Sequence, residues 1–63
     1  MENKTGQLIA RRRKEIGLTQ KELAERLGVT NKAVSKWETG GGMPDVSVLE
    51  TLADALEVSV DEL

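Results

Sequence analysis

The chain of 63 residues contains no cysteine and no histidine. Without cysteine it forms no disulfide and has no thiolate for redox or metal chemistry. Without histidine it has no Ser-His-Asp triad, and a zinc site would need an unusual set of four carboxylates. These absences argue against an enzyme, a metal site and any other cofactor. They predict a protein that binds a partner and does not catalyse.

Aromatic residues and long apolar runs are also scarce. Trp37 is the single aromatic residue, and the longest uninterrupted apolar run is three residues, too short to span a membrane. The opening residues lack the apolar segment of a secretory signal. We therefore expect a soluble cytoplasmic protein with no small-molecule site. Its length predicts one domain, 1–63, that buries only about 60% of its unfolded surface.

The net charge of −2 hides a strong asymmetry. Residues 1–39 carry all nine basic residues and five acidic ones, a net charge of +4. Residues 40–63 carry six acidic residues and no basic one. Such segregation indicates a basic working surface and an acidic back. The alternative is a solvated surface with chance clustering, and a pI of about 5.0 argues against indiscriminate polyanion binding.

The pattern of apolar residues predicts an all-α domain of five helices. Good helix formers dominate, and no sustained alternation of apolar and polar residues indicates a strand. The expected helices cover 5–15, 20–27 and 31–39, followed by one after Pro44 with Asp45 as N-cap and a short one after Ser59.

The last two helices are predicted from local signals. The helix after Pro44 carries an amphipathic stripe of Val46, Leu49, Leu52, Ala53 and Leu56. Ser59 and Glu62 have the spacing of a capping box, with Val58 and Leu63 as the accompanying hydrophobic staple.

A very short turn joins helix 20–27 to helix 31–39. Thr19 and Glu22 predict a capping box for the first helix, and Thr30 is the expected cap of the second. Gly28 supplies the left-handed residue that ends the first helix. So short a connection does not let the helices fold back antiparallel. It is typical of a helix-turn-helix, whose second helix enters the DNA major groove, whereas an ordinary corner of a small bundle is the alternative.

The outer face of helix 31–39 favours the DNA-binding interpretation. With Ala33, Val34 and Trp37 turned inward, this face carries no acid and consists of Asn31, Lys32, Ser35, Lys36 and Thr39. Asn, Lys and Ser side chains suit base edges in the major groove. We predict that the first four contact bases and that Thr39 contacts DNA phosphate. A solvated helix face is the alternative.

Gln20 opens helix 20–27, where its side chain and the free backbone N–H groups of the first turn point the same way. Helix N-termini bind anions through such groups. We predict that Gln20 contacts DNA phosphate, the alternative being a filler residue beside the Thr19 cap.

Two charged residues lie among the apolar residues that face the predicted core. Arg13 lies between Ile9 and Ile16, and Glu38 lies beside the inward Val34 and Trp37. A buried unpaired charge costs several kcal/mol. We therefore predict that Arg13 and Glu38 form an ion pair that ties the first helix to the third.

With these residues the chain resembles the Cro/C1-type helix-turn-helix family of phage repressors and bacterial regulators. The matching segments are Arg13, then Gly17-Leu18-Thr19-Gln20, KELAERLGVTNKAVSKWETG at 21–40 and MPDVSVLETLADALEVSVDEL at 43–63. The resemblance covers nearly the whole chain. It implies a compact, five-helix, lambda-repressor-like domain that binds a double-stranded DNA operator as a homodimer. It also implies the same roles for the residues named above.

The chain departs from the family pattern at several positions. Thr5 and Arg12 replace residues that are usually aliphatic, and Gly41-Gly42 replaces a stretch that often holds a basic phosphate contact. Arg11, Arg12 and Lys14 are expected to be surface charges.

The sequence predicts the operator-binding domain of a prokaryotic or phage transcription regulator. Two alternatives come from other classes. One is an antitoxin-like protein-interaction module that keeps the fold without contacting DNA, which Lys32 and Lys36 argue against. The other is an enzyme fragment, which the missing histidine and cysteine argue against.

Overall fold

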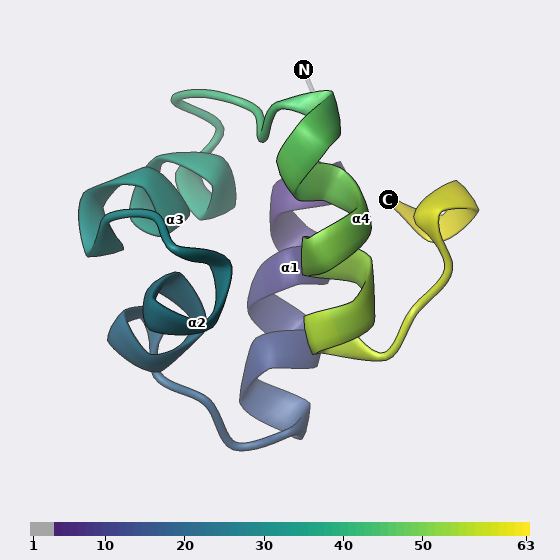
Figure 1. Ribbon diagram of the computed structural model, residues 1–63, viewed down its shortest axis with the longest axis horizontal. Coiled ribbons are helices and arrows are strands. Elements are labelled where there is room, and N and C mark those ends of the chain that lie inside the picture. The colour runs from purple at the N-terminus through teal and green to yellow at the C-terminus, as the bar shows by residue number, and fades with distance from the viewer. Residues whose placement is uncertain (1–3) are drawn as a thin grey trace.

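The computed structural model describes residues 4–63, and within them four α-helices and one 3₁₀ turn form, with no strand (Figure 1). The elements follow one another as α1 (Lys4–Glu15), α2 (Gln20–Leu27), α3 (Asn31–Thr39), α4 (Val46–Leu56) and η1 (Val60–Glu62). The all-α prediction is confirmed, and α2 and α3 have the predicted bounds.

All four α-helices contribute to one core. Its fully buried members are Ile9 of α1, Leu23 of α2, Val34 of α3, and Leu52 and Leu56 of α4. Trp37 closes the core from α3, as its inward position predicted. α1 and α2 each contact both α3 and α4. In Figure 1 α1 and α4 lie together on one side, and the pair α2–α3 lies on the other.

The ends of α2 and α3 are fixed by local hydrogen bonds. The Thr19 side chain accepts from Glu22 N–H at 3.0 Å, and the Glu22 carboxylate accepts from Thr19 N–H at 2.8 Å, so the predicted capping box is present. Thr30 caps α3 by accepting from Ala33 N–H at 3.1 Å. Gly28 ends α2 at φ 70° and ψ 29°, a conformation that glycine adopts without steric cost. These caps set the short turn between the two helices.

The prediction of a fifth α-helix is wrong. Val60–Glu62 forms a single 3₁₀ turn, closed by Glu62 N–H to Ser59 C=O at 3.1 Å and Leu63 N–H to Val60 C=O at 3.0 Å. The Ser59 side chain makes no capping hydrogen bond, so the second capping box does not form. A segment this short has too few i→i+4 bonds to repay the cost of nucleating an α-helix.

The start of α4 also differs from expectation. Asp45 occupies the N-cap position, but its side chain makes no capping hydrogen bond. Val46, which the sequence pattern predicts on the apolar stripe, is 84% exposed. The buried stripe of α4 therefore begins later than predicted and consists of Leu52, Ala53 and Leu56.

Arg12 is not the surface charge that the sequence suggested. Its side chain is 25% exposed, and its Nε donates to the Leu56 carbonyl at 3.0 Å, at the C-terminal end of α4. Its Nη1 lies 3.0 Å from the Glu15 carboxylate. Thr5 similarly donates its hydroxyl to the Leu63 carbonyl at 2.7 Å. Both departures from the family pattern thus attach α1 to the C-terminal segment.

Candidate nucleic-acid interface

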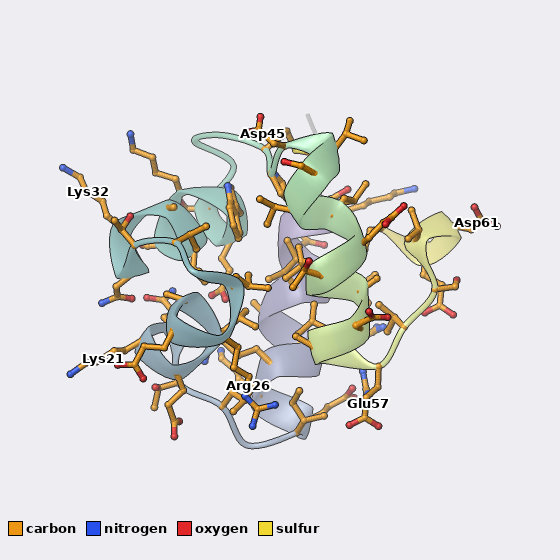
Figure 2. The ribbon with its side chains drawn as sticks, in the orientation of Figure 1. Lys21, Arg26, Lys32, Asp45, Glu57 and Asp61 are labelled. Carbon is orange, nitrogen blue, oxygen red and sulfur yellow. The ribbon has the colours of Figure 1, made fainter. Side chains whose placement is uncertain are left out.

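The outer face of α3 is a continuous polar surface. Asn31, Lys32 and Lys36 are exposed, and Ser35 between them is partly exposed. Among residues 4–63, none of these four side chains takes part in a hydrogen bond or ion pair. Lys32 extends away from the bundle in Figure 2. Four predicted base-contacting residues are therefore free to meet a partner outside the chain.

Thr39 is exposed at the end of the same helix, but its hydroxyl is already engaged. It donates to the Ser35 carbonyl at 2.9 Å and approaches the Lys36 carbonyl at 3.4 Å. This bond uses the single hydroxyl proton, and a phosphate oxygen can only accept. Thr39 must therefore release its intrahelical bond before it can donate to a phosphate.

Gln20 is the first residue of α2 and lies beside the end of α3. Its Nε2 donates to the Glu38 carboxylate at 3.0 Å, a contact that the sequence did not predict. The side chain remains partly exposed. Lys21 follows it, exposed, and extends from the same side of the molecule as Lys32 in Figure 2. The sequence did not lead us to predict Lys21 as a site residue, although its position in the first turn of α2 indicates it.

Arg13 and Glu38 meet beneath this surface. Arg13 Nε lies 2.7 Å from Glu38 Oε2, and Arg13 Nη2 lies 3.0 Å from Glu38 Oε1, a bidentate pair between α1 and α3. Arg13 Nη1 donates to the Leu18 carbonyl at 2.9 Å, just before α2. Arg13 is only 9% exposed, so the pair is shielded from solvent and ties three helices together.

The protonation states of this pair follow from its surroundings. Burial alone would raise the pKa of Glu38, but the hydrogen bonds from Arg13 and Gln20 and the charges of Arg13 and Lys14 outweigh it, so the pKa lies below its usual value. The hydrogen bond to Glu38 raises the pKa of Arg13, against the opposing effect of burial. Both groups are therefore charged at neutral pH, and their charges cancel beneath the α3 surface.

Several charges of opposite sign lie on different sides of the molecule. In Figure 2 Lys21 and Lys32 extend from the side formed by α2 and α3, whereas Asp61 and Glu57 lie on the side of η1 and the end of α4. All six acidic residues of 40–63 are exposed. The elements α4 and η1, whose exposed carboxylates are here called the acidic face, lie on the other side of the molecule from α3 (Figure 1), although α2 also exposes Glu22 and Glu25.

The described part of the chain holds no group of residues that suits a small-molecule pocket or a metal site. No pocket opens among these residues, and no three of their carboxylates lie together as metal ligands. None of the helices combines the length and apolar character needed to cross a membrane.

The comparisons of this chain with known proteins agree on one family. A family model described as helix-turn-helix matches residues 9–63. The cryptic phage CTXphi transcriptional repressor RstR of Vibrio cholerae is 42% identical over 55 residues, which are 87% of this chain. The chain spans 49% of that repressor, about half its length.

Solved structures share the fold. The P22 c2 repressor, crystallised with a synthetic operator, superposes with a TM-score of 0.87 at 37% identity, over 90% of this chain and 86% of that one. An FeII HppE structure in complex with substrate also superposes, with a TM-score of 0.84 at 28% identity, over 98% of this chain and 35% of that one. The fold therefore occurs in proteins with different ligands. The partner of this chain has to be inferred from its own surface residues.

Proposed function

The chain belongs to the helix-turn-helix family, and from that premise we propose that it is the operator-binding part of a transcription regulator. The observation that carries the proposal is the outer face of α3. It holds four polar side chains with no partner in the described structure and no acid among them, on a helix fixed from below by a buried ion pair. Such a helix suits insertion into the major groove.

In this arrangement the surface residues divide into two roles. Asn31, Lys32, Ser35 and Lys36 contact base edges, since Asn pairs well with adenine and Lys with guanine. Gln20 and Thr39 contact phosphates and set the orientation of α3 on the duplex. Lys21 joins the phosphate contacts, because its ammonium extends from the first turn of α2 on the same side.

We further propose that two chains bind one operator. Each helix-turn-helix domain contacts one half-site, and a dimer aligns two copies of α3 with two half-sites about one helical turn apart. Sedimentation of the protein with a selected duplex tests this part. A complex of two chains on each operator supports it, and a single chain on a full-length operator contradicts it.

The proposal includes no enzymatic activity. The likeness to FeII HppE extends over 35% of that protein, and this chain has no histidine or cysteine with which to hold iron in the usual way. Addition of Fe²⁺ should leave the melting temperature of the purified chain unchanged. A clear rise that depends on the metal concentration would reopen the question.

Selection from a random pool of duplexes, followed by sequencing, tests the main proposal. We expect enrichment of one short motif, and tight binding of the enriched duplex in a fluorescence anisotropy titration. A protein-interaction module would enrich no motif, and its affinity for all duplexes would be equally weak.

A further inference from the structure

The Glu38 carboxylate joins side chains from three helices. Its Oε1 accepts from Arg13 Nη2 of α1 and from Gln20 Nε2 of α2, both at 3.0 Å, and its Oε2 accepts from Arg13 Nε at 2.7 Å. The contact with Gln20 adds a third hydrogen bond to the two that the ion pair supplies. That contact connects the buried pair with the first residue of α2.

The chemistry of this contact fixes how Gln20 is oriented. An ionised carboxylate can only accept hydrogen bonds, so the amide NH₂ of Gln20, and not its carbonyl, must face Glu38. One N–H is used in this bond, which leaves the second N–H as the only side-chain donor for an outside partner. Because the side chain is partly exposed, that donor can reach the surface.

The backbone around Gln20 is fixed by the same network. Arg13 Nη1 donates to the Leu18 carbonyl at 2.9 Å, and Leu18 N–H donates back to the Arg13 carbonyl at 2.9 Å. The Thr19 capping box follows directly and leaves the N–H groups of Gln20 and Lys21 without acceptors inside α2. The amide and these N–H groups are thus held at one helix end before any DNA arrives.

We propose that Glu38 is a positioning residue for DNA binding, which acts by orienting the Gln20 amide toward a phosphate of the operator. The proposal rests on the proposed function. Arg13 has a second role in it, because it neutralises a carboxylate that would otherwise repel the nearby phosphate. A preoriented donor loses less side-chain freedom on binding than a mobile one, so operator affinity rises.

The test compares Glu38→Asp, Gln20→Ala and the double variant in operator titrations, with Glu50→Asp on the exposed face of α4 as the matched control. Glu38→Asp keeps the negative charge but withdraws the carboxylate by one methylene, from Arg13 as well as from Gln20, so a thermal melt checks that this variant stays folded. We expect each single variant to weaken operator binding about 2- to 10-fold, the range of one net hydrogen bond. The double variant should be no weaker than Gln20→Ala alone, and the control should bind normally.

A structural role for Glu38 alone predicts a different result. If Glu38→Asp binds normally while folded, or if its loss multiplies with that of Gln20→Ala, the positioning role is overturned. If the unaltered chain selects no duplex at all, the proposed function fails, whatever the variants do.

A spectroscopic measurement supports the test even if Glu38→Asp folds poorly. The chain has two glutamines, and Gln7 is exposed on α1, so its side-chain NH₂ serves as an internal reference for NMR. In the free protein, one Gln20 NH₂ proton should be shifted away from the Gln7 values, and the shift should disappear as Glu38 is protonated. Identical NH₂ resonances for Gln7 and Gln20 would overturn the proposal.

Discussion

Arg13 shows how a charge is accommodated in a small core. Its Nε, Nη1 and Nη2 each donate a hydrogen bond, to the Glu38 carboxylate and the Leu18 carbonyl, so every guanidinium nitrogen has an acceptor. Replacement of such a pair by apolar residues is often neutral, whereas removal of one partner leaves a buried charge without compensation. The value of the pair is therefore best measured by breaking it from each side.

Arg13→Ala and Glu38→Ala should each destabilise the fold by about 3–5 kcal/mol. A chain of this length has a total stability of about 3–9 kcal/mol, so either change removes much of it. The double variant should lose less than the sum, because no unpaired charge remains. Urea denaturation of the three variants measures this. Small, strictly additive losses would show that solvent already screens the pair.

Glu38 also makes stability depend on pH. Its pKa is lowered in the folded state, so its contribution is present above the unfolded pKa of about 4.3 and is lost as the pH falls through the lower folded value. The melting temperature of the unaltered chain should therefore exceed that of Glu38→Gln at pH 7, and the difference should shrink as the pH falls from about 4.3 through the lower folded pKa. A constant difference down to about pH 2 would contradict the assignment.

Among the helices, α4 ends differently from α2 and α3. Gly28 and Gly40 take the left-handed position at the ends of α2 and α3, whereas Glu57 takes it after α4, with φ 59° and ψ 43°. Left-handed backbone costs a residue with a Cβ about 1–2 kcal/mol. Arg12, which donates to the neighbouring Leu56 carbonyl, offsets part of this cost by placing a cation at the C-terminal end of the helix.

Glu57→Gly and Glu57→Asn should therefore stabilise the chain, by up to about 1 kcal/mol, since both residues adopt the left-handed conformation more readily. Thermal melts detect a change of this size as a rise of several degrees in a domain this small. Glu57→Ala serves as the control, because it removes the charge without relieving the backbone. A rise with alanine equal to that with glycine would assign the effect to charge instead.

How well the sequence predicted each element depended on the distance over which its signals act. The bounds of α2 and α3 were predicted correctly because caps and glycines within four residues determine them. The Arg13–Glu38 contact was predicted because each charge interrupts an apolar line. By contrast, the Arg12 and Thr5 bonds join residues 44 and 58 positions apart, and nothing near either residue indicates its partner. The Gln20 contact with Glu38 depends on the packing of α2 against α3 and was missed for the same reason.

The helix-turn-helix predicts different roles for α3 and α2. Asn31→Ala or Lys36→Ala should weaken binding to the best duplex by about 1–3 kcal/mol and relax the preference at one or two base pairs. Gln20→Ala should weaken binding to all duplexes about equally, because a phosphate contact carries no sequence information. A panel of duplexes with single base changes measures both effects, and thermal melts check that the variants stay folded. Unchanged affinity and preference in both α3 variants would favour the protein-interaction alternative.

At the scale of the whole molecule, distance decides how the acidic face affects DNA binding. The principal extents are 28, 23 and 23 Å, and α4 and η1 lie on the side of the molecule away from α3 (Figure 1). Electrostatic interactions are screened over about 8 Å at 0.15 M salt and over about 30 Å at 0.01 M. The acidic face therefore acts on DNA bound to α3 only at low salt, whereas nearby Lys32 and Lys36 act at both.

Neutralisation of the acidic face tests this argument. We expect the triple variant Glu50→Gln, Asp54→Asn, Asp61→Asn to bind the selected duplex less than about 2-fold more tightly at 0.15 M salt, but clearly more tightly at 0.01 M. Lys32→Gln should bind more weakly at both concentrations, since the proposed function places the Lys32 ammonium against the DNA. For the unaltered chain, log affinity should fall linearly with log salt as phosphate contacts release counterions. The measurement is one anisotropy titration for each protein at each salt concentration. An equal gain for the triple variant at both concentrations would mean that α4 or η1 lies against the DNA, and that the duplex does not occupy the α3 face as proposed.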